Sequence, residues 1–142
     1  MTQLTFRVGP GAKIVRQGLQ DLAAAVPKIG RRQVRNTLER IKKIMKVYPP
    51  ERSGQLYART FKLKRGWKIE SAGPSGYKIS NRASFRGREY AVHVVGSATG
   101  ERQAWMHVGR WPLFRNVVDA EGAKLPFEIA RHIRIKARKL RL

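Results

Sequence analysis

The chain has no cysteine, few acidic residues and no long apolar run, and each absence excludes a class of protein. Without cysteine, disulfide bonds and thiolate metal sites are excluded, so the core must be stabilised by packing or by neighbouring subunits. No apolar run approaches the roughly 20 residues that span a bilayer. The charged-then-apolar order of a signal peptide is missing from the first ten residues, MTQLTFRVGP. We therefore expect a protein that is soluble and cytosolic when synthesised, with no membrane partner.

Acidic residues are so scarce that the chain carries a formal net charge of +22, from 31 Lys and Arg against 9 Asp and Glu. At this charge density self-repulsion opposes compaction of an isolated monomer, and a polyanion or an acidic protein surface relieves it. The basic residues are spread along the whole sequence, so they do not form one detachable arm. The charge indicates an acidic partner and leaves open whether that partner is DNA or a protein.

The length of 142 residues suits one domain with a hydrophobic core and is too short for two ordinary domains. We expect a single α+β domain with N-terminal helices, a small antiparallel β-sheet and a C-terminal amphipathic helix. Its expected parts are an N-terminal strand and helices (1–47), an ordered loop (48–60), a β-meander with an aromatic loop (61–111) and a basic C-terminal helix (112–142).

Apolar residues at helical spacing predict two N-terminal helices, over 12–25 and about 28–46. Pro27 is expected to stop or kink the first helix, and the prolines after Tyr48 are expected to end the second. A short opening strand is expected at Thr5–Val8. The two apolar stripes are Val15, Leu19, Leu22 and Val26, and then Val34, Leu38, Ile41 and Met45.

From Gln55 to Val95 the apolar period changes to two, which predicts strands in a hairpin or meander. The alternating pairs and the turn cluster between them are Phe61/Leu63, Trp67/Ile69, Ala72–Gly76 and Tyr77/Ile79. Glu89–Val95 has apolar residues on both alternating faces. We therefore expect it to be a central strand or one covered by a helix.

The C-terminal segment predicts a basic amphipathic helix that begins at Pro126. Its apolar stripe is Ile129, Ile133, Ala137 and Leu140. Residues 131–142 contain no acid, so this end either attracts anions or stays solvated. The residues expected to face a polyanion are Arg131, Arg134, Lys136, Arg138, Lys139 and Arg141.

An aromatic segment lies within residues 87–111, where Trp105 and Trp111 bracket a stretch too rich in glycine for a regular helix. Loop aromatics beside Arg are typical of interface anchors. Equally, a loop that folds back buries its tryptophans in its own core. Both interpretations stay open. Under the first, the interface residues are Trp105, Met106, His107, Arg110 and Trp111.

Metal-binding and cofactor-binding patterns are missing from the sequence. His93, His107 and His132 are far apart, and no HExxH-like pair exists. Ser53 and Ser97 lack a recognisable nucleophile context, and no glycine-rich phosphate loop is present. We expect no metal, no cofactor and no enzymatic activity.

Two further functions remain as alternatives. A metal-free ribonuclease could use His107 as acid, Arg110 as phosphate clamp and Glu101 as base. Three suitable residues in one loop are a common accident in a chain this basic. Sequence-independent nucleic-acid binding has stronger support, because Lys and Arg gain affinity by releasing condensed counterions. No helix–turn–helix, zinc-finger, KH or RRM signature is visible, so such binding would involve the backbone.

Several motifs, in their order, resemble a known family. The segment Tyr48–Thr60, YPPERSGQLYART, followed by the strand around Trp67, resembles the "proline, then Arg-Ser/Thr-Gly-x-Leu, then a strand" signature of small tail-completion and neck proteins of tailed bacteriophages. The family's "asparagine, small residue, Tyr-Ala, Val-x-Gly" strand is similar to Asn81–Ala83, Tyr90-Ala91 and Val95-Gly96, although Val95 and Gly96 are adjacent here. The segment that closes that strand is similar to Gln103–His107 and Gly109–Trp111.

This resemblance covers roughly residues 28–133, and a charge of +22 is not expected in every member of the family. It implies a structural virion protein, located in the neck or tail, that forms an oligomeric ring at the head–tail junction. The partners it implies are further copies of the chain and portal, neck or tail-tube proteins. The basic surface would face either packaged DNA or an acidic protein. Gly54 is expected to order the loop before the sheet, because glycine permits backbone angles that other residues avoid.

Overall fold

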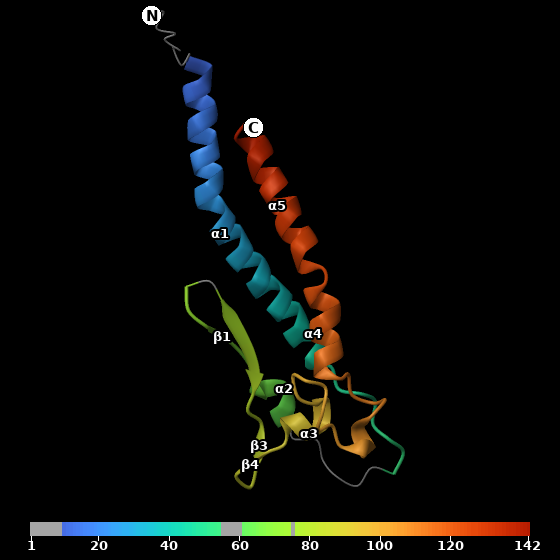
Figure 1. Cartoon of the computed structure of the whole chain (residues 1–142). Coiled ribbons are helices and arrows are strands. Elements are labelled where there is room, and N and C mark those ends of the chain that lie inside the picture. Colours follow the sequence, from blue (N-terminus) through green and yellow to red (C-terminus); the bar gives the residue numbers. More distant parts are fainter. Residues whose placement is uncertain (1–9, 55–60, 75) are drawn as a thin grey trace, which may run out of the picture. The chain divides into compact units, whose positions relative to one another are not determined.

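The computed structural model describes residues 10–54, 61–74 and 76–142. It has the expected α+β character, with a long N-terminal helix, small antiparallel β-pairs and a C-terminal helix (Figure 1). Backbone contacts group the chain into two compact units. Unit 1 consists of the N-terminal segment up to Gln33 together with Pro126–Leu142, and unit 2 is Val34–Leu125. The predicted strand Thr5–Val8 and residues 55–60 of the predicted loop lie outside the described residues.

The N-terminal helix α1 runs without interruption over Pro10–Met45. The prediction of two helices separated at Pro27 is therefore wrong, because Pro27 lies inside the helix. A proline in this position removes one hydrogen bond, from its own missing N–H to the carbonyl of Ala23, and the helix bears that cost. Packing on both sides of Pro27 favours continuation, since Gly18 before it is buried beside Leu142, and Ile29 and Ile41 after it are buried.

The hydrophobic core of unit 2 forms around the C-terminal half of α1. The predicted stripe is confirmed there, because Ile41 and Met45 are fully buried and Leu38 packs against them. The indole of Trp67 stacks on the ring of Phe114 with 5.5 Å between centroids. The buried members of this core are Ile41, Met45, Leu63, Trp67, Ala83, Ala91, Val94 and Val95.

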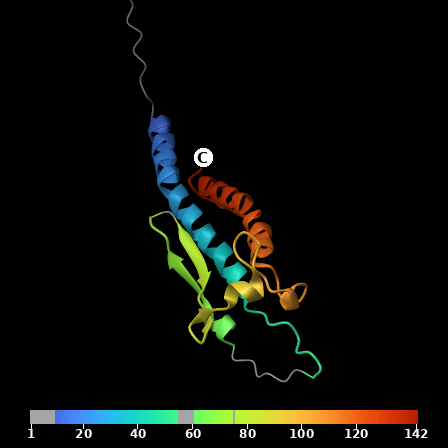
Figure 2. The same ribbon diagram turned by 60° about the horizontal axis from the view of Figure 1, so that its bottom comes forward.

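A two-stranded antiparallel hairpin follows, with β1 at Trp67–Ser71 and β2 at Tyr77–Asn81. This part of the β prediction is confirmed, and the backbone N–H of Ala72 closes the turn onto the carbonyl of Gly76 at 3.0 Å. The hairpin lies along the C-terminal half of α1 (Figures 1 and 2), where the Arg35 guanidinium is 5.9 Å from the centre of the Tyr77 ring.

The expected meander is smaller in the structure than in the sequence-based prediction. The short strands β3 (Ser84–Phe85) and β4 (Arg88–Glu89) form a separate antiparallel pair. Upstream of β1, the alternating pair Phe61/Leu63 does not belong to a strand, because helix α2 occupies Lys62–Gly66. The loop before it contains Gly54 at a positive φ of 75°, which agrees with the expectation for this glycine.

The predicted strand over Glu89–Val95 is wrong, since residues Ala91–Val95 form helix α3. Ala91, Val94 and Val95 are the buried residues of this helix, at i, i+3 and i+4 spacing. Because nearly every residue of this segment is apolar, its pattern fits both the helical period and the strand period of two. Gly96, at φ 78° and ψ 169°, ends the helix there and donates its N–H to the carbonyl of Val92.

Two helices complete the chain, α4 over Phe114–Gly122 and α5 over Leu125–Lys139. Within residues 112–142 the sequence predicts one basic helix that begins at Pro126. It does not predict α4. In unit 1 the Pro126–Leu142 segment lies beside the N-terminal half of α1 and runs in the opposite direction (Figures 1 and 2). A Cβ atom placed on Gly18 would lie 3.1 Å from Cδ2 of Leu142, so the two segments of unit 1 pack closely there.

Glu121 of α4 is a buried carboxylate held by two cations in unit 2. Arg40 donates from Nε to Oε2 at 2.8 Å, and Lys124 donates from Nζ to Oε1. Arg40 also donates to the Thr37 hydroxyl at 3.1 Å. These hydrogen bonds, from Lys124 first and then Arg40, lower the pKa of Glu121 below its usual value. The ion pair therefore joins α4 to α1 within this unit.

We expect Glu121→Gln to lower the free energy of unfolding at neutral pH by about 1 kcal/mol, a small value because both cations stay partly solvated. Because the pKa of Glu121 is lower in the folded state, its stabilising contribution is present above pH 4.5 and is lost as the pH falls through the folded pKa. Thermal unfolding of both proteins from pH 7 to pH 3 should therefore converge at the acidic end. The control Asp119→Asn, which breaks an exposed pair with Arg115, should change stability by less than about 0.5 kcal/mol. Equal acid sensitivity of the Gln variant and the parent would contradict this assignment.

Candidate interface loop

The segment Gln103–Trp111, called the interface loop here, is fixed to unit 2 at its first residues. The N–H of Ala104 donates to the carbonyl of His93 at 2.7 Å. The side chain of Gln103 donates from Nε2 to the carbonyl of Val94 at 2.8 Å and to the carbonyl of Trp111 at 3.3 Å. One amide group thus joins helix α3 to both ends of the loop. Hydrogen bonds thus fix both ends of the loop within unit 2.

The middle of the loop is a 3₁₀ helix, η1, over Trp105–His107. It is closed by hydrogen bonds from the N–H groups of Arg110 and Trp111 to the carbonyl of His107, at 3.1 and 3.0 Å. Gly109 lies at a positive φ of 73°, a conformation that favours glycine and lets the chain reverse here. The side chains of η1 therefore project from a short turn that is closed by its own backbone hydrogen bonds.

The two tryptophans of the loop have opposite environments. Trp111 is half-buried, packs against the core of unit 2 and meets the Tyr48 ring edge-on, with 4.8 Å between centroids. Trp105 is 83% exposed, and its neighbours Met106 and Val108 are exposed as well. The loop folds back at Trp111, whereas the side chain of Trp105 is exposed to solvent, so whether Trp105 anchors an interface stays a prediction.

His107 is half-buried between the exposed tip and the core. Burial is the largest cause that lowers its pKa, and the charges of Arg110 and Arg52 lower it further. Within the described residues its buried Nδ1 atom has no hydrogen-bond partner. A lowered pKa keeps the imidazole neutral at pH 7. His107 therefore adds no charge to the loop at neutral pH.

The side chain of Arg110 hydrogen-bonds to a backbone carbonyl outside the loop. Its guanidinium donates from Nη2 to the carbonyl of Pro50 at 2.8 Å, which connects the interface loop to the chain after α1. The carboxylate of Glu101 is exposed and makes no hydrogen bond or ion pair with His107 in the described parts of the chain. The acid and the base of the ribonuclease alternative therefore make no direct contact in the described parts of the chain. A neutral His107 is also unsuited to act as a general acid at neutral pH.

The residues predicted to face a polyanion lie along α5 and its end. Lys136 is half-buried and lines a groove in unit 1. The exposed members of this set are Arg131, Arg134, Arg138, Lys139 and Arg141. Sequence analysis did not connect them with Lys28 and Arg32 of α1, which line the same groove as Lys136. Helical spacing places Lys28 and Arg32 on one face, and that was the available signal.

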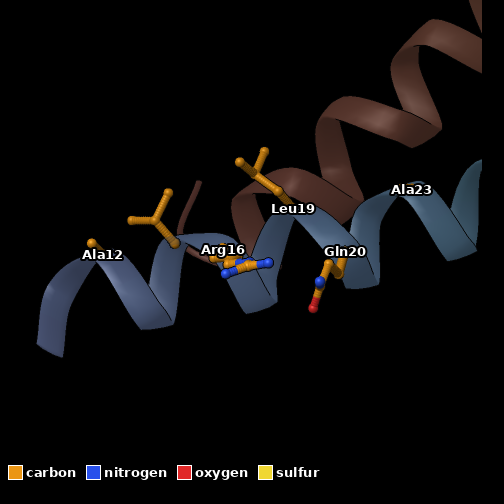
Figure 3. Close-up of a pocket in the computed structure, with 6 residues that line it drawn as sticks. Ala12, Arg16, Leu19, Gln20 and Ala23 are labelled. Carbon is orange, nitrogen blue, oxygen red and sulfur yellow. The ribbon is translucent and has the colours of Figure 1, made fainter. Parts of the chain in front are cut away.

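An open hollow lies on the N-terminal half of α1, where Val15 and Leu19 are about half exposed. Its lining residues are Ala12, Val15, Arg16, Leu19, Gln20 and Ala23, all from this one helix (Figure 3). Leu19 and Gln20 project from different sides of the ribbon (Figure 3). Polar groups do not converge on the hollow, so it has no features of a small-molecule site. Val15 and Leu19 in this hollow are the exposed part of the apolar stripe predicted for this helix.

Within residues 10–54, 61–74 and 76–142, no group of three or more His, Asp or Glu side chains is arranged to hold a metal ion. None of the described helices combines the length and apolar character needed to cross a bilayer.

Comparisons with protein-family models, with curated proteins and with solved structures find no match to this chain. The functional interpretation therefore depends on its own residues and their arrangement.

Proposed function

We propose that the chain is a structural virion protein of a tailed bacteriophage, a neck or tail-completion subunit that assembles into a ring at the head–tail junction. The observation that carries this proposal is the interface loop. A side chain as large as that of Trp105, 83% exposed on a turn fixed by hydrogen bonds at both ends, has the properties of an interface anchor. The sequence motifs that resemble this family support the same assignment.

A ring requires two different surfaces on each subunit, because contacts related by rotation join unlike patches. Two exposed apolar surfaces are available. One is the tip of the interface loop in unit 2, and the other is the stripe with Val15 and Leu19 on α1 in unit 1. In this proposal the loop of one copy docks on a neighbouring copy. Repulsion between highly positive subunits makes that assembly dependent on salt or on an acidic partner.

Trp105→Ala tests this proposal, because removing a central aromatic anchor typically costs 2 kcal/mol or more, on the order of thirtyfold or more in affinity. We expect the parent protein to form a discrete oligomer at moderate salt and the variant to stay monomeric under the same conditions, as measured by mass photometry. Phe127→Ala is the matched control. It removes another exposed aromatic side chain, 77% exposed and in unit 1, and should leave assembly unchanged.

Two results would count against the proposal. A parent protein that stays monomeric across the whole salt range would reject the ring. A parent that oligomerises while Trp105→Ala assembles equally well would reject the anchor.

A further inference from the structure

A groove with cationic walls runs between the two antiparallel helices of unit 1. Its apolar lining is Ala25 and Ile29 from α1 and Ile135 from α5. Its ionisable lining is Lys28, Arg32, His132, Lys136 and Lys139, called the cationic groove here. Ile29 is buried, and Leu142 packs on Gly18 further along the same pair of helices. The walls of the groove are therefore held by side-chain packing within one unit.

The charge in the cationic groove is uncompensated. No acidic residue lines it. In the described parts of the chain, its four Lys and Arg side chains and His132 make no hydrogen bond or ion pair. Like charges held close together destabilise the protein that carries them. An anionic ligand would remove that cost, and a single carboxylate would neutralise only one of the four.

The spacing of the cations suits a repeating anion. With a rise of about 1.5 Å per residue, Lys28 and Arg32 are about 6 Å apart along α1. On α5 the distance along the axis from His132 to Lys139 is about 10 Å. A nucleic-acid strand presents a phosphate about every 3.4 Å of helix axis. The α1 wall therefore extends over about two phosphate intervals and the α5 wall over about three.

We propose that the cationic groove binds the sugar–phosphate backbone of a nucleic acid without reading its base sequence. Arg32 offers a planar guanidinium that pairs with phosphate oxygens through two hydrogen bonds, and the three lysines act as mobile point charges. The lining contains neither Asn nor Gln, which pair with adenine edges, and no Phe, Tyr or Trp ring on which a base could stack. This site does not depend on ring assembly and is present in the monomer.

The test measures how binding to a short fluorescent DNA duplex of mixed sequence depends on salt, using the full chain. Lys28→Gln/Arg32→Gln should weaken binding at low salt about tenfold or more and lower the slope of log affinity against log salt by about 1.8, for two lost phosphate contacts. Lys136→Gln/Lys139→Gln removes the opposite wall and should lower the slope by a similar amount. Circular dichroism checks that each variant keeps its helices.

The matched control is Arg131→Gln/Arg134→Gln, which removes the same charge from exposed positions of α5 outside the groove. Its slope should change by less than about half as much. If the control loses as much as the groove variants, the binding is diffuse and the groove is not a site. Groove-dependent binding of poly-glutamate with no binding of the duplex would instead reject a nucleic acid in favour of an acidic protein. Because the assay works on the monomer, failure of ring formation leaves this result interpretable.

Discussion

Trp111→Ala is expected to lower the free energy of unfolding by about 3 kcal/mol, as truncation of a large packed aromatic does. The Trp111 ring lies against the core of unit 2 and meets Tyr48 at 4.8 Å, and its backbone carbonyl accepts a hydrogen bond from Gln103. Truncation leaves a cavity beneath the interface loop. Urea denaturation followed by far-ultraviolet circular dichroism measures the loss.

Trp105→Ala is the control, since the same substitution is made six residues earlier on a side chain that is mostly in water. It should change the unfolding free energy by less than about 0.5 kcal/mol. Equal destabilisation by the two substitutions would mean that Trp105 is also packed in solution. A neutral result for Trp111→Ala would mean that the loop does not depend on its inner tryptophan.

Gly96→Ala should destabilise the protein by about 3 kcal/mol, the sum of backbone strain and overpacking. At φ 78° and ψ 169° its backbone is in a region that is essentially restricted to glycine. An added Cβ would also lie 2.5 Å from Cδ1 of Leu113 and 3.3 Å from the carbonyl oxygen of Glu101. The Leu113 side chain can move, whereas the Glu101 backbone is held by its hydrogen bond from Ser97.

Gly109→Ala is the comparison variant, because an added Cβ there meets no neighbouring atom. Gly109 has a similar positive φ of 73°, but no atom lies within 4 Å of a Cβ placed on it. Alanine there should cost only about 1 kcal/mol for the left-handed backbone. Thermal unfolding of both variants measures the difference. If Gly96→Ala were no worse than Gly109→Ala, neither the glycine-restricted backbone angles of Gly96 nor the close approach of Leu113 and Glu101 would hold in solution.

Periodicity predicted the parts of the fold in which one apolar face dominates. The stripe with Ile41 and Met45 and the Trp67–Ile69 alternation both appear as expected, because each has polar residues on the opposite face. The same method failed over Glu89–Val95, where apolar residues at nearly every position satisfy both periods. Helix α4 was missed although Phe114, Val117 and Val118 have helical spacing and pack on the core.

The candidate sites show a different limit of sequence analysis. Composition identified the interface loop, but it could not assign one tryptophan to the core and the other to solvent. That assignment depends on where Tyr48 lies, and Tyr48 is far away in the sequence. The cationic groove was missed for the same reason. Lys28 and Lys136 are on separate helices, and periodicity within one helix does not reveal which neighbour it packs against.

Pro27 leaves one hydrogen bond of α1 unmade. Unwinding that begins at the N-terminal end and reaches Pro27 therefore breaks one hydrogen bond fewer than in an uninterrupted helix. Ile14 and Val15, near that end, are largely exposed and contribute little tertiary stabilisation. A neighbouring subunit that docked on this end, as proposed above, would also stabilise the first turns of α1 against fraying. Part of its association free energy would be spent on that ordering, so the contact would be weaker than its apolar area suggests.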